Sequence, residues 1–291
     1  MPQWPGMAGK LYIVSTPIGN LEDITQRALR ILREVDLIAC EDTRHTRKLL
    51  THFGIETKTI SYHEHNESER AHELCEMLVA GKSVALVSDA GTPLISDPGF
   101  RIVSLAIERE VAVVPVPGAN AAIAALAAAG LPSREFFFAG FLPARAGARA
   151  ARLEQLRSLE ATLILYETPH RIAATLRAAA EILGARDAVV VRELTKLHEE
   201  FARGTLSQLA EIFADKSRAR GEIVLLIAAA PETGRQTNSA SVSTDLAERL
   251  SSLQQQGLDE KTALKKAARE LGLKRDEAYR LLIAQKNRRS R

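Results

Sequence analysis

The stretch SVALVSDAGTPLISDPG, residues 83–99, joins a short apolar run to a loop that holds two Asp, two Pro and two Gly. The run is short and rich in Val, which is typical of a buried strand. Open α/β sheets bind their ligands in loops at the carboxyl ends of such strands. The stretch therefore predicts one strand of an α/β sheet and a loop that contributes to a binding site.

The same pattern recurs along the chain, with segments of helical apolar periodicity between the runs. In the first half we expect strands at residues 11–17, 36–42, 57–63, 83–89 and 111–117. In the second half we expect strands at residues 135–142, 161–168, 187–194, 199–206 and 221–229, with fewer and longer helices. The pattern predicts an α/β fold with an N-terminal α/β domain over 10–118 and a C-terminal α/β domain over 119–230, whose sheet is mixed.

Composition is that of a folded globular protein. The 291 residues are 46% hydrophobic and 26% charged, and the length favours two domains. Residues 1–9 lack the layout of a signal peptide and are expected to form a flexible leader. No run approaches the roughly 20 apolar residues of a membrane span, so no membrane partner is expected. The two cysteines, Cys40 and Cys75, make neither a disulfide framework nor a zinc site, which fits a reducing cytoplasm.

The last sixty residues differ from the rest in charge. Residues 232–291 hold 13 Lys and Arg against 8 Asp and Glu, a net charge of +5, which leaves −2 for residues 1–231. We expect a linker over 231–241 and a basic helical tail over 242–291. Its helices are predicted at 244–256, 259–271 and 274–285, in helix-turn-helix spacing. Such a unit usually contacts nucleic acid, but a dimerisation hairpin remains open.

The loop after the first predicted strand, residues 15–24 (STPIGNLEDI), carries turn and cap residues. Asn20 or Asp23 is expected to cap the next helix. The loop contains neither the dinucleotide-binding fingerprint nor the phosphate-binding loop of nucleotide hydrolases. Those two classes are therefore disfavoured.

The loop after the second predicted strand mixes acids with cations. Glu41 and Asp42 precede Arg44 and His45, and further cations follow at the start of a helix. Because a helix N-terminus disfavours cations, they require an acid or a bound anion nearby. An Asp42 cap with an Arg44–Glu41 salt bridge would account for half of them, and we favour an RNA or phosphate contact for the rest.

Other strand ends carry further polar residues. The segment PGANAA contains Asn120 as a helix cap, and the segments LYETPHR and RELTK end two later strands. The run His63, Glu64 and His65 could suggest a metal site, but no further ligand occurs at a matching spacing. We therefore expect no metal site.

Taken together, these motifs resemble one known family. They are STPIGNLEDIT, ACEDTRHTRKLL, SYHEHNE, VALVSDAGTPLISDPG, PGANAA, YETPHR, and RELTK with RGTL. In this order they resemble the ribosomal small-subunit RNA 2′-O-ribose methyltransferases, a branch of the tetrapyrrole methylase superfamily. The resemblance implies two α/β domains with S-adenosylmethionine (SAM) in the cleft between them. It also implies methylation of a cytidine ribose in the decoding region of 16S rRNA within the small ribosomal subunit, and a homodimer.

The resemblance also implies cofactor-binding residues, carried over by position. They are Pro17, Ser88, Asp89, Ala90, Thr92, Asn120, Ala121, Tyr166, Glu167 and Gly204. Among them Asp89 suits a ligand with cationic groups and ribose hydroxyls. Asp97, in the same loop, is expected instead to cap the helix that begins near Phe100. Leu94 departs from the family pattern, in which a small residue is commoner.

The acceptor hydroxyl needs a general base or a stabilising cation. Asp23, Glu41, Asp42 and Lys196 are candidates. We favour a catalytic cluster of Glu41, Asp42, Arg44 and His45. Two other functions stay open, a methyltransferase acting on a tetrapyrrole or other small molecule, and a non-catalytic RNA-binding protein.

Overall fold

The fold was analysed in a computed structural model of the chain. It describes residues 9–215, 220–230, 249–250, 252–254 and 259–270. Residues 1–230 form one compact unit and residues 231–291 a second. The predicted leader falls almost entirely outside the described residues, and the linker and the helix at 274–285 lie wholly outside them. The domain limits at 118 and 119 stay a prediction.

The first sheet contains five parallel strands in the order β3-β2-β4-β1-β5. The strands are β1 Lys10–Val14, β2 Leu37–Cys40, β3 Thr59–Ser61, β4 Val84–Val87 and β5 Ala112–Val116. The helices are η1 Leu21–Asp23, α1 Gln26–Glu34, α2 Thr43–His52, α3 Glu67–Val79 and α4 Phe100–Glu108. Four of these strands lie within the predicted segments and β1 begins one residue before its segment, which confirms an α/β fold.

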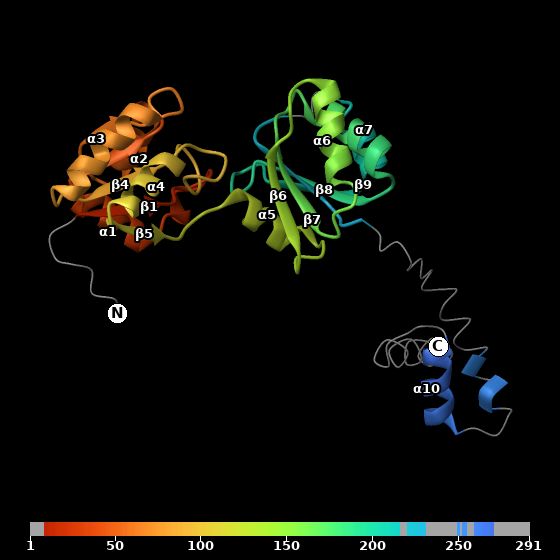
Figure 1. The fold of residues 1–291 in the computed structure, drawn as a ribbon. Helices are drawn as coiled ribbons and strands as arrows, with labels where there is room; N and C mark the ends of the chain where they lie inside the picture. The colour runs from red at the N-terminus through yellow and green to blue at the C-terminus, as the bar shows by residue number, and fades with distance from the viewer. Residues whose placement is uncertain (1–8, 216–219, 231–248, 251, 255–258, 271–291) are drawn as a thin grey trace. The chain divides into compact units, whose positions relative to one another are not determined.

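Helices cover both faces of this sheet because successive strand residues point to opposite sides. Ile38 packs with α1 and with Leu50 of α2. Ala39, the next residue, packs on the other face with α3 and α4. Both faces of each strand are thus buried, as the continuous apolar runs predict for a parallel sheet. Figure 1 shows these elements around the first sheet.

The second sheet is mixed, in the order β6-β7-β10-β8-β9. Its strands are β6 Phe136–Phe141, β7 Thr162–Glu167, β8 Asp187–Arg192, β9 Glu200–Thr205 and β10 Ile223–Ile227. Strands β6 and β7 pair in parallel, and the other pairs are antiparallel. The prediction of a mixed second sheet is confirmed.

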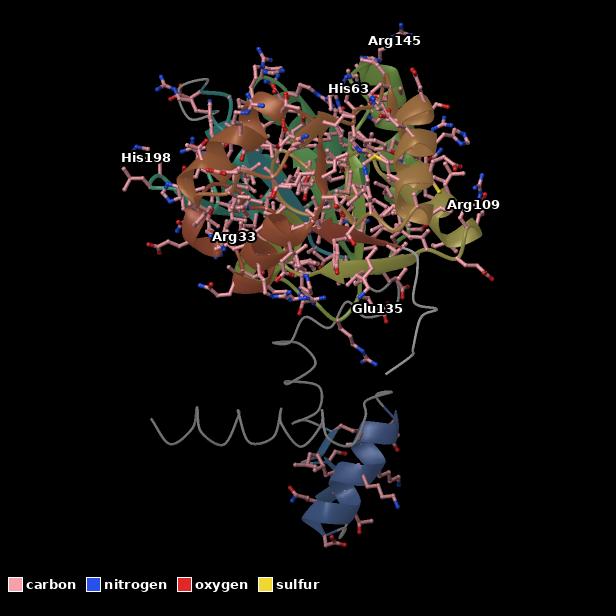
Figure 2. The ribbon with its side chains drawn as sticks, turned by 90° about the vertical axis from the view of Figure 1, so that its left-hand side faces the viewer. Arg33, His63, Arg109, Glu135, Arg145 and His198 are labelled. Carbon is pink, nitrogen blue, oxygen red and sulfur yellow. The ribbon has the colours of Figure 1, made fainter. Side chains whose placement is uncertain are left out.

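Four helices sandwich this sheet: α5 Ala121–Ala129, α6 Ala146–Leu156, α7 Ile172–Leu183 and α8 Leu206–Ile212. Helices α6, α7 and α8 pack on one face and α5 on the other. The Ala-rich α5 lies close to the sheet, because its buried positions are Ala122, Ala125, Leu126 and Ala129. Charged side chains such as Arg109 and Arg145 point away from the unit (Figure 2).

In the second unit, α10 Glu260–Glu270 occupies the helix predicted at 259–271. Leu250 and Leu253 pack with Ala263 and Ala267 in a small core. The two described parts are held together by an ion pair between Arg249 and Glu270, with Nε–Oε2 2.6 Å. Among the described residues, no helix is long and apolar enough to cross a membrane.

Candidate active site

Three strand-end loops of the first sheet are fastened to one another. The strands β4, β1 and β5 are neighbours, so their carboxyl ends meet at one edge. The backbones of Thr16 and Gly91 exchange two hydrogen bonds, with N–O distances of 2.8 and 3.1 Å. The hydroxyl of Thr92 donates to the carbonyl of Ala119 at 3.2 Å and lies 3.0 Å from the hydroxyl of Ser15. These contacts hold the loops after β1, β4 and β5 as one wall.

The loop after β4 has an unusual backbone. Leu94 and Ser96 have positive φ values of 72° and 68°. Such left-handed conformations in non-glycine residues carry strain and persist only where surrounding contacts enforce them. Leu94 packs against the α3–α4 core, and a Cβ at Gly99 would lie 2.9 Å from its side chain. The loop is thus folded back tightly, with Leu94 inward and Asp97 toward a cavity.

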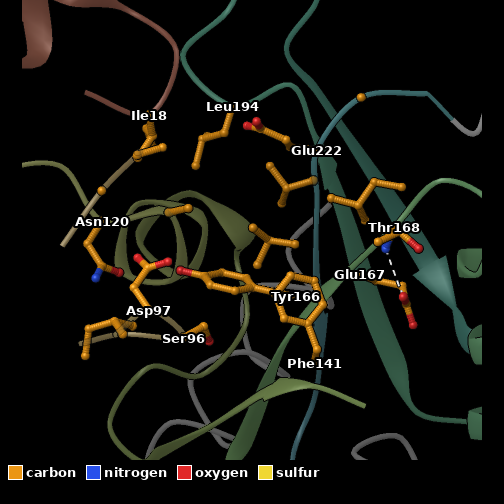
Figure 3. A pocket seen from close by; sticks show the side chains of 18 of the residues that line it. Ile18, Ser96, Asp97, Asn120, Phe141, Tyr166, Glu167, Thr168, Leu194 and Glu222 are labelled. Carbon is orange, nitrogen blue, oxygen red and sulfur yellow. Dashed lines mark hydrogen bonds between the residues drawn. The ribbon is translucent and has the colours of Figure 1, made fainter. Parts of the chain in front are cut away.

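That cavity has a volume of about 370 Å³ and is lined by both sheets. The first sheet supplies residues of the three fastened loops, including Ile18, Ala90 and Asn120. The second sheet supplies strand-end residues, including Phe141 and Tyr166, whose rings meet edge to face with centroids 5.6 Å apart. Figure 3 shows Asp97 and Asn120 on one side and the aromatic rings on the other. A volume in this range, largely apolar with a few polar groups, is typical of a site for a small organic ligand.

The predicted cofactor residues fall into three groups. Six of them line the cavity: Ala90, Thr92, Asn120, Ala121, Tyr166 and Glu167. Pro17, Ser88 and Asp89 line a second hollow, of about 280 Å³, on α2. Gly204 lines neither; it lies in β9 opposite Ala188, and its backbone approaches Gln208. The structure therefore brings together most of the set, but not around one cavity.

Glu167 lines the cavity, but its carboxylate is engaged elsewhere. The side chain is fully buried, and Figure 3 shows it directed away from Asp97 and Tyr166. It accepts hydrogen bonds from the Thr168 backbone at 2.8 Å and the Thr175 hydroxyl at 2.5 Å, and pairs with Arg171 at 3.2 Å. Because its oxygens are occupied inside the lobe, this carboxylate stabilises the turn into α7.

Asp97 does not cap α4, so that prediction is wrong. The cap residue of α4 is Gly99, without a side-chain cap bond. Glu67 of α3 supplies the carboxylate instead, because its Oε1 accepts from the backbones of Gly99 at 3.2 Å and Arg101 at 3.3 Å. Asp97 is thereby left free to face the cavity.

Three carboxylates, those of Glu41, Asp89 and Asp97, repel one another where the loops after β2 and β4 meet. Burial, with repulsion from Glu41 and Asp89, raises the pKa of Asp97 to about 6, against a lowering by the Ser88 hydroxyl. Burial and repulsion from Asp89 also raise the pKa of Glu41. Three carboxylates thus share one poorly solvated region, which favours a cationic ligand there.

The second hollow lies between the first loop and α2. His45, Thr46 and Lys48 line it from the helix. Asp42 caps α2 by accepting from the Arg44 backbone at 2.8 Å, which confirms the predicted cap. Arg44 pairs with Asp42 at 3.1 Å rather than with the expected Glu41. The favoured cluster is therefore divided, because Glu41 faces the other carboxylates while Asp42 and Arg44 form a surface pair.

The structure also shows the contacts of Asn20, a candidate helix cap, and of Lys196, a candidate general base. Asn20 caps η1 by accepting from the Glu22 backbone, whereas Thr25 caps α1. Lys196 is bonded to Glu193 and to Glu222, each at 3.1 Å. Although burial lowers the pKa of Lys196, these two carboxylates outweigh it and raise the pKa overall. A firmly protonated lysine is unsuited to act as a base.

Other residues of the cavity were not found from the sequence. Phe141, Leu194 and Glu222 line it, and each lies at the end of a strand or just outside it. Their position at strand ends is the only signal that the sequence carried. No group of three potential metal ligands occurs in the described part of the chain.

Comparison with known proteins places this architecture in a family. The model of the Tetrapyrrole (Corrin/Porphyrin) Methylases matches residues 10–210. The chain therefore belongs to the tetrapyrrole methylase family, a family of methyltransferases, as the motifs indicated.

Within that family, proteins named Ribosomal RNA small subunit methyltransferase I are similar to the chain. The protein of Halalkalibacterium halodurans is 52% identical over 219 residues, which cover 75% of each chain. The protein of Vibrio cholerae is 51% identical over 234 residues, covering 80% of this chain and 81% of that one. The protein of Synechocystis is 48% identical over 276 residues, covering 94% and 98%.

Solved structures show the same fold at low identity. Diphthine synthase aligns with a TM-score of 0.58 and 18% identity, covering 76% of this chain and 90% of that one. Uroporphyrin-III C-methyltransferase from Thermus thermophilus, solved with S-adenyl homocysteine, aligns with a TM-score of 0.54 and 19% identity, covering 76% and 97%. The predicted fold class, two α/β lobes of the tetrapyrrole methylase type, is confirmed.

We predict that Glu167→Ala destabilises the protein strongly, because it leaves Arg171 without its buried carboxylate. Breaking a buried ion pair in this way costs about 3–5 kcal/mol. Denaturant unfolding followed by circular dichroism measures the change. Glu154→Ala is the matched control, because Glu154 pairs with Arg157 at an exposed surface and should cost under about 0.5 kcal/mol. Equal stability of the two variants would contradict the structural role of Glu167.

Proposed function

We propose that this protein transfers a methyl group from SAM to the ribose 2′-hydroxyl of a cytidine in the decoding region of 16S rRNA. The observation that carries the proposal is the identity of about 50% to proteins named Ribosomal RNA small subunit methyltransferase I, over three quarters of the chain or more. The motifs that line the cavity lie within the matched region. The proposal includes the small ribosomal subunit as the substrate particle, action in the cytoplasm and a homodimer.

The cavity lined by both sheets fits SAM. The adenine suits the side formed by Tyr166 and Phe141, because aromatic edges and faces bury a flat heterocycle well. The loop of Ala90, Gly91 and Thr92 allows close approach of a ligand to the backbone. Asp97 supplies negative charge near the cationic amino and sulfonium groups.

The chemistry is divided between cofactor and protein. SAM supplies an electrophilic methyl group, and the protein orients the acceptor oxygen and takes its proton. We assign the acceptor side to Glu41, Asp42, Arg44 and His45. The raised pKa of Glu41 makes its carboxylate a stronger base than an ordinary glutamate, and Arg44 and His45 at the start of α2 would supply positive charge to a developing alkoxide.

Mapping of ribose methylation tests the function directly. In cells that lack this protein we expect one cytidine of the 16S rRNA decoding region to lose its 2′-O-methyl group, as detected by mass spectrometry. The purified protein should restore it on small subunits with SAM, and a porphyrinogen offered in parallel should receive no methyl group. Methylation of the porphyrinogen alone would instead favour a small-molecule methyltransferase.

We predict that SAM binding depends on pH through Asp97. Its pKa of about 6 means that the carboxyl is largely neutral at pH 5 and ionised at pH 7. Because a cationic ligand prefers the ionised form, affinity should rise as pH increases through 6, with protons released on binding near pH 6. Calorimetry in two buffers of different ionisation enthalpy measures the release. Asp97→Asn should bind more weakly at pH 7 and lose this dependence; an unchanged pH profile would argue against the contact.

A substitution of Asp42 can distinguish a catalytic role of this residue from its role as the cap of α2. Asp42→Asn keeps a good helix cap but removes the charge that pairs with Arg44. We expect it to reduce kcat at least about 100-fold, because Arg44 loses the carboxylate that holds it on the acceptor side and loss of one such stabilising group typically costs that much, while SAM affinity stays near normal. Arg44→Ala should also lose methylation without losing SAM affinity. If Asp42→Asn turns over normally, Asp42 serves only as the cap of α2.

A further inference from the structure

Helix α2 carries a concentration of positive charge. From Thr43 to Ile55 the sequence has three Arg and Lys and two His, and no Asp or Glu. Residues 1–231 as a whole have a net charge of −2, so the positive charge of this helix differs in sign from that of the region around it. Cations near a helix N-terminus are unfavourable unless an anion offsets them. One of the three, Arg44, is offset by Asp42.

The other two cations of α2 have no such partner. Arg47 and Lys48 make no ion pair with any residue of the described part of the chain, whereas some cations on neighbouring helices do. Examples are Arg30 with Glu34 on α1 and Arg70 with Glu73 on α3. Arg33 extends the positive surface at the far end of α2, where its Nη2 donates to the Phe53 carbonyl at 2.9 Å. Unpaired cations on one face are typical of a contact with an external anion.

The position of these cations relates them to the site. Lys48 lines the second hollow together with Pro17, Ser88 and Asp89. It also lines a shallow depression with Arg44, Arg47 and His52. The second hollow therefore opens toward a basic surface, while its other wall is made by the loops that also border the cavity assigned to SAM.

We propose that this basic face of α2, formed by Arg44, Arg47, Lys48 and His52, holds the phosphates of single-stranded RNA beside the methylated nucleotide. The second hollow then receives the nucleoside itself. This assignment rests on the proposed function and names the part of the protein that holds its substrate. Residues 44 to 52 extend over about 12 Å of helix at 1.5 Å per residue. A surface of that length spans more than one phosphate, which suits a strand better than a small anion.

Direct contacts of this kind make two measurable differences. Phosphate contacts act on substrate binding, so Arg47→Ala with Lys48→Ala should raise KM for small subunits about tenfold or more, with kcat and SAM affinity nearly unchanged. Each contact to single-stranded RNA adds about 0.7 to the slope of log affinity against log salt concentration. Loss of two contacts should therefore reduce that slope by about 1.4. A purely structural change would not alter the salt slope.

The experiment compares three proteins in methylation of small subunits and in binding of a single-stranded RNA oligonucleotide. The control is Lys82→Ala with Arg177→Ala, which removes two exposed cations from other surfaces without touching α2. We expect the control to match the unmodified protein in KM and in salt slope. Equal losses in both variants would indicate a general charge effect and overturn the proposal, as would an unchanged salt slope in the α2 variant.

The outcomes also separate this inference from the proposed function. If the unmodified protein methylates small subunits and the α2 variant behaves identically, the function stands and the α2 surface is wrong. If the unmodified protein methylates no RNA, the function fails, and oligonucleotide binding alone then decides whether α2 holds RNA.

Discussion

The site depends on the pair of backbone hydrogen bonds between Thr16 and Gly91. It joins the loops after β1 and β4, two neighbouring strands whose ends would otherwise carry independent loops. Thr92 adds the loop after β5 through the carbonyl of Ala119. Because these backbone and hydroxyl groups hydrogen-bond to one another, they need no water partners. The three loops can therefore form a wall between two hollows. Side chains on the two sides of this wall can then contact different ligands.

The two hollows differ as a transfer reaction between unlike substrates requires. The larger is mostly apolar, with Asp97 and Glu222 among its acidic residues, and the smaller opens to the cations of α2. The first hollow is therefore faced by Asp97, whereas the second combines the cations of α2 with the carboxylate of Asp89. Asp89, which lines the second hollow, accepts a hydrogen bond from the Asp42 backbone at 3.1 Å and links the wall to α2.

Local patterns predicted the fold well, because each strand is a short apolar run that can be recognised without knowing which strand it pairs with. The caps by Asp42 and Asn120 were also predictable, since each side chain bonds a backbone N–H two or three residues ahead. The cap of α4 was not, because Glu67 reaches it from another helix across 32 residues. The contacts of Glu167 were unpredictable from the sequence for the same reason. Only the folded turn into α7 directs its carboxylate inward, so position at a strand end did not reveal what it contacts.

The segment between β8 and β9 of the second lobe contacts the loop after β1 of the first lobe. Glu193 and Thr195 have positive φ values of 50° and 67°, a strained course that brings Lys196 against the first loop. A Cβ at Gly19 would lie 2.6 Å from the Lys196 side chain, so only glycine fits there. The two ion pairs of Lys196 hold its stem in place while its ammonium stays within the second lobe. Lys196, one of the candidates for the general base, therefore contacts both lobes, with its stem beside Gly19 and its ammonium paired with Glu193 and Glu222.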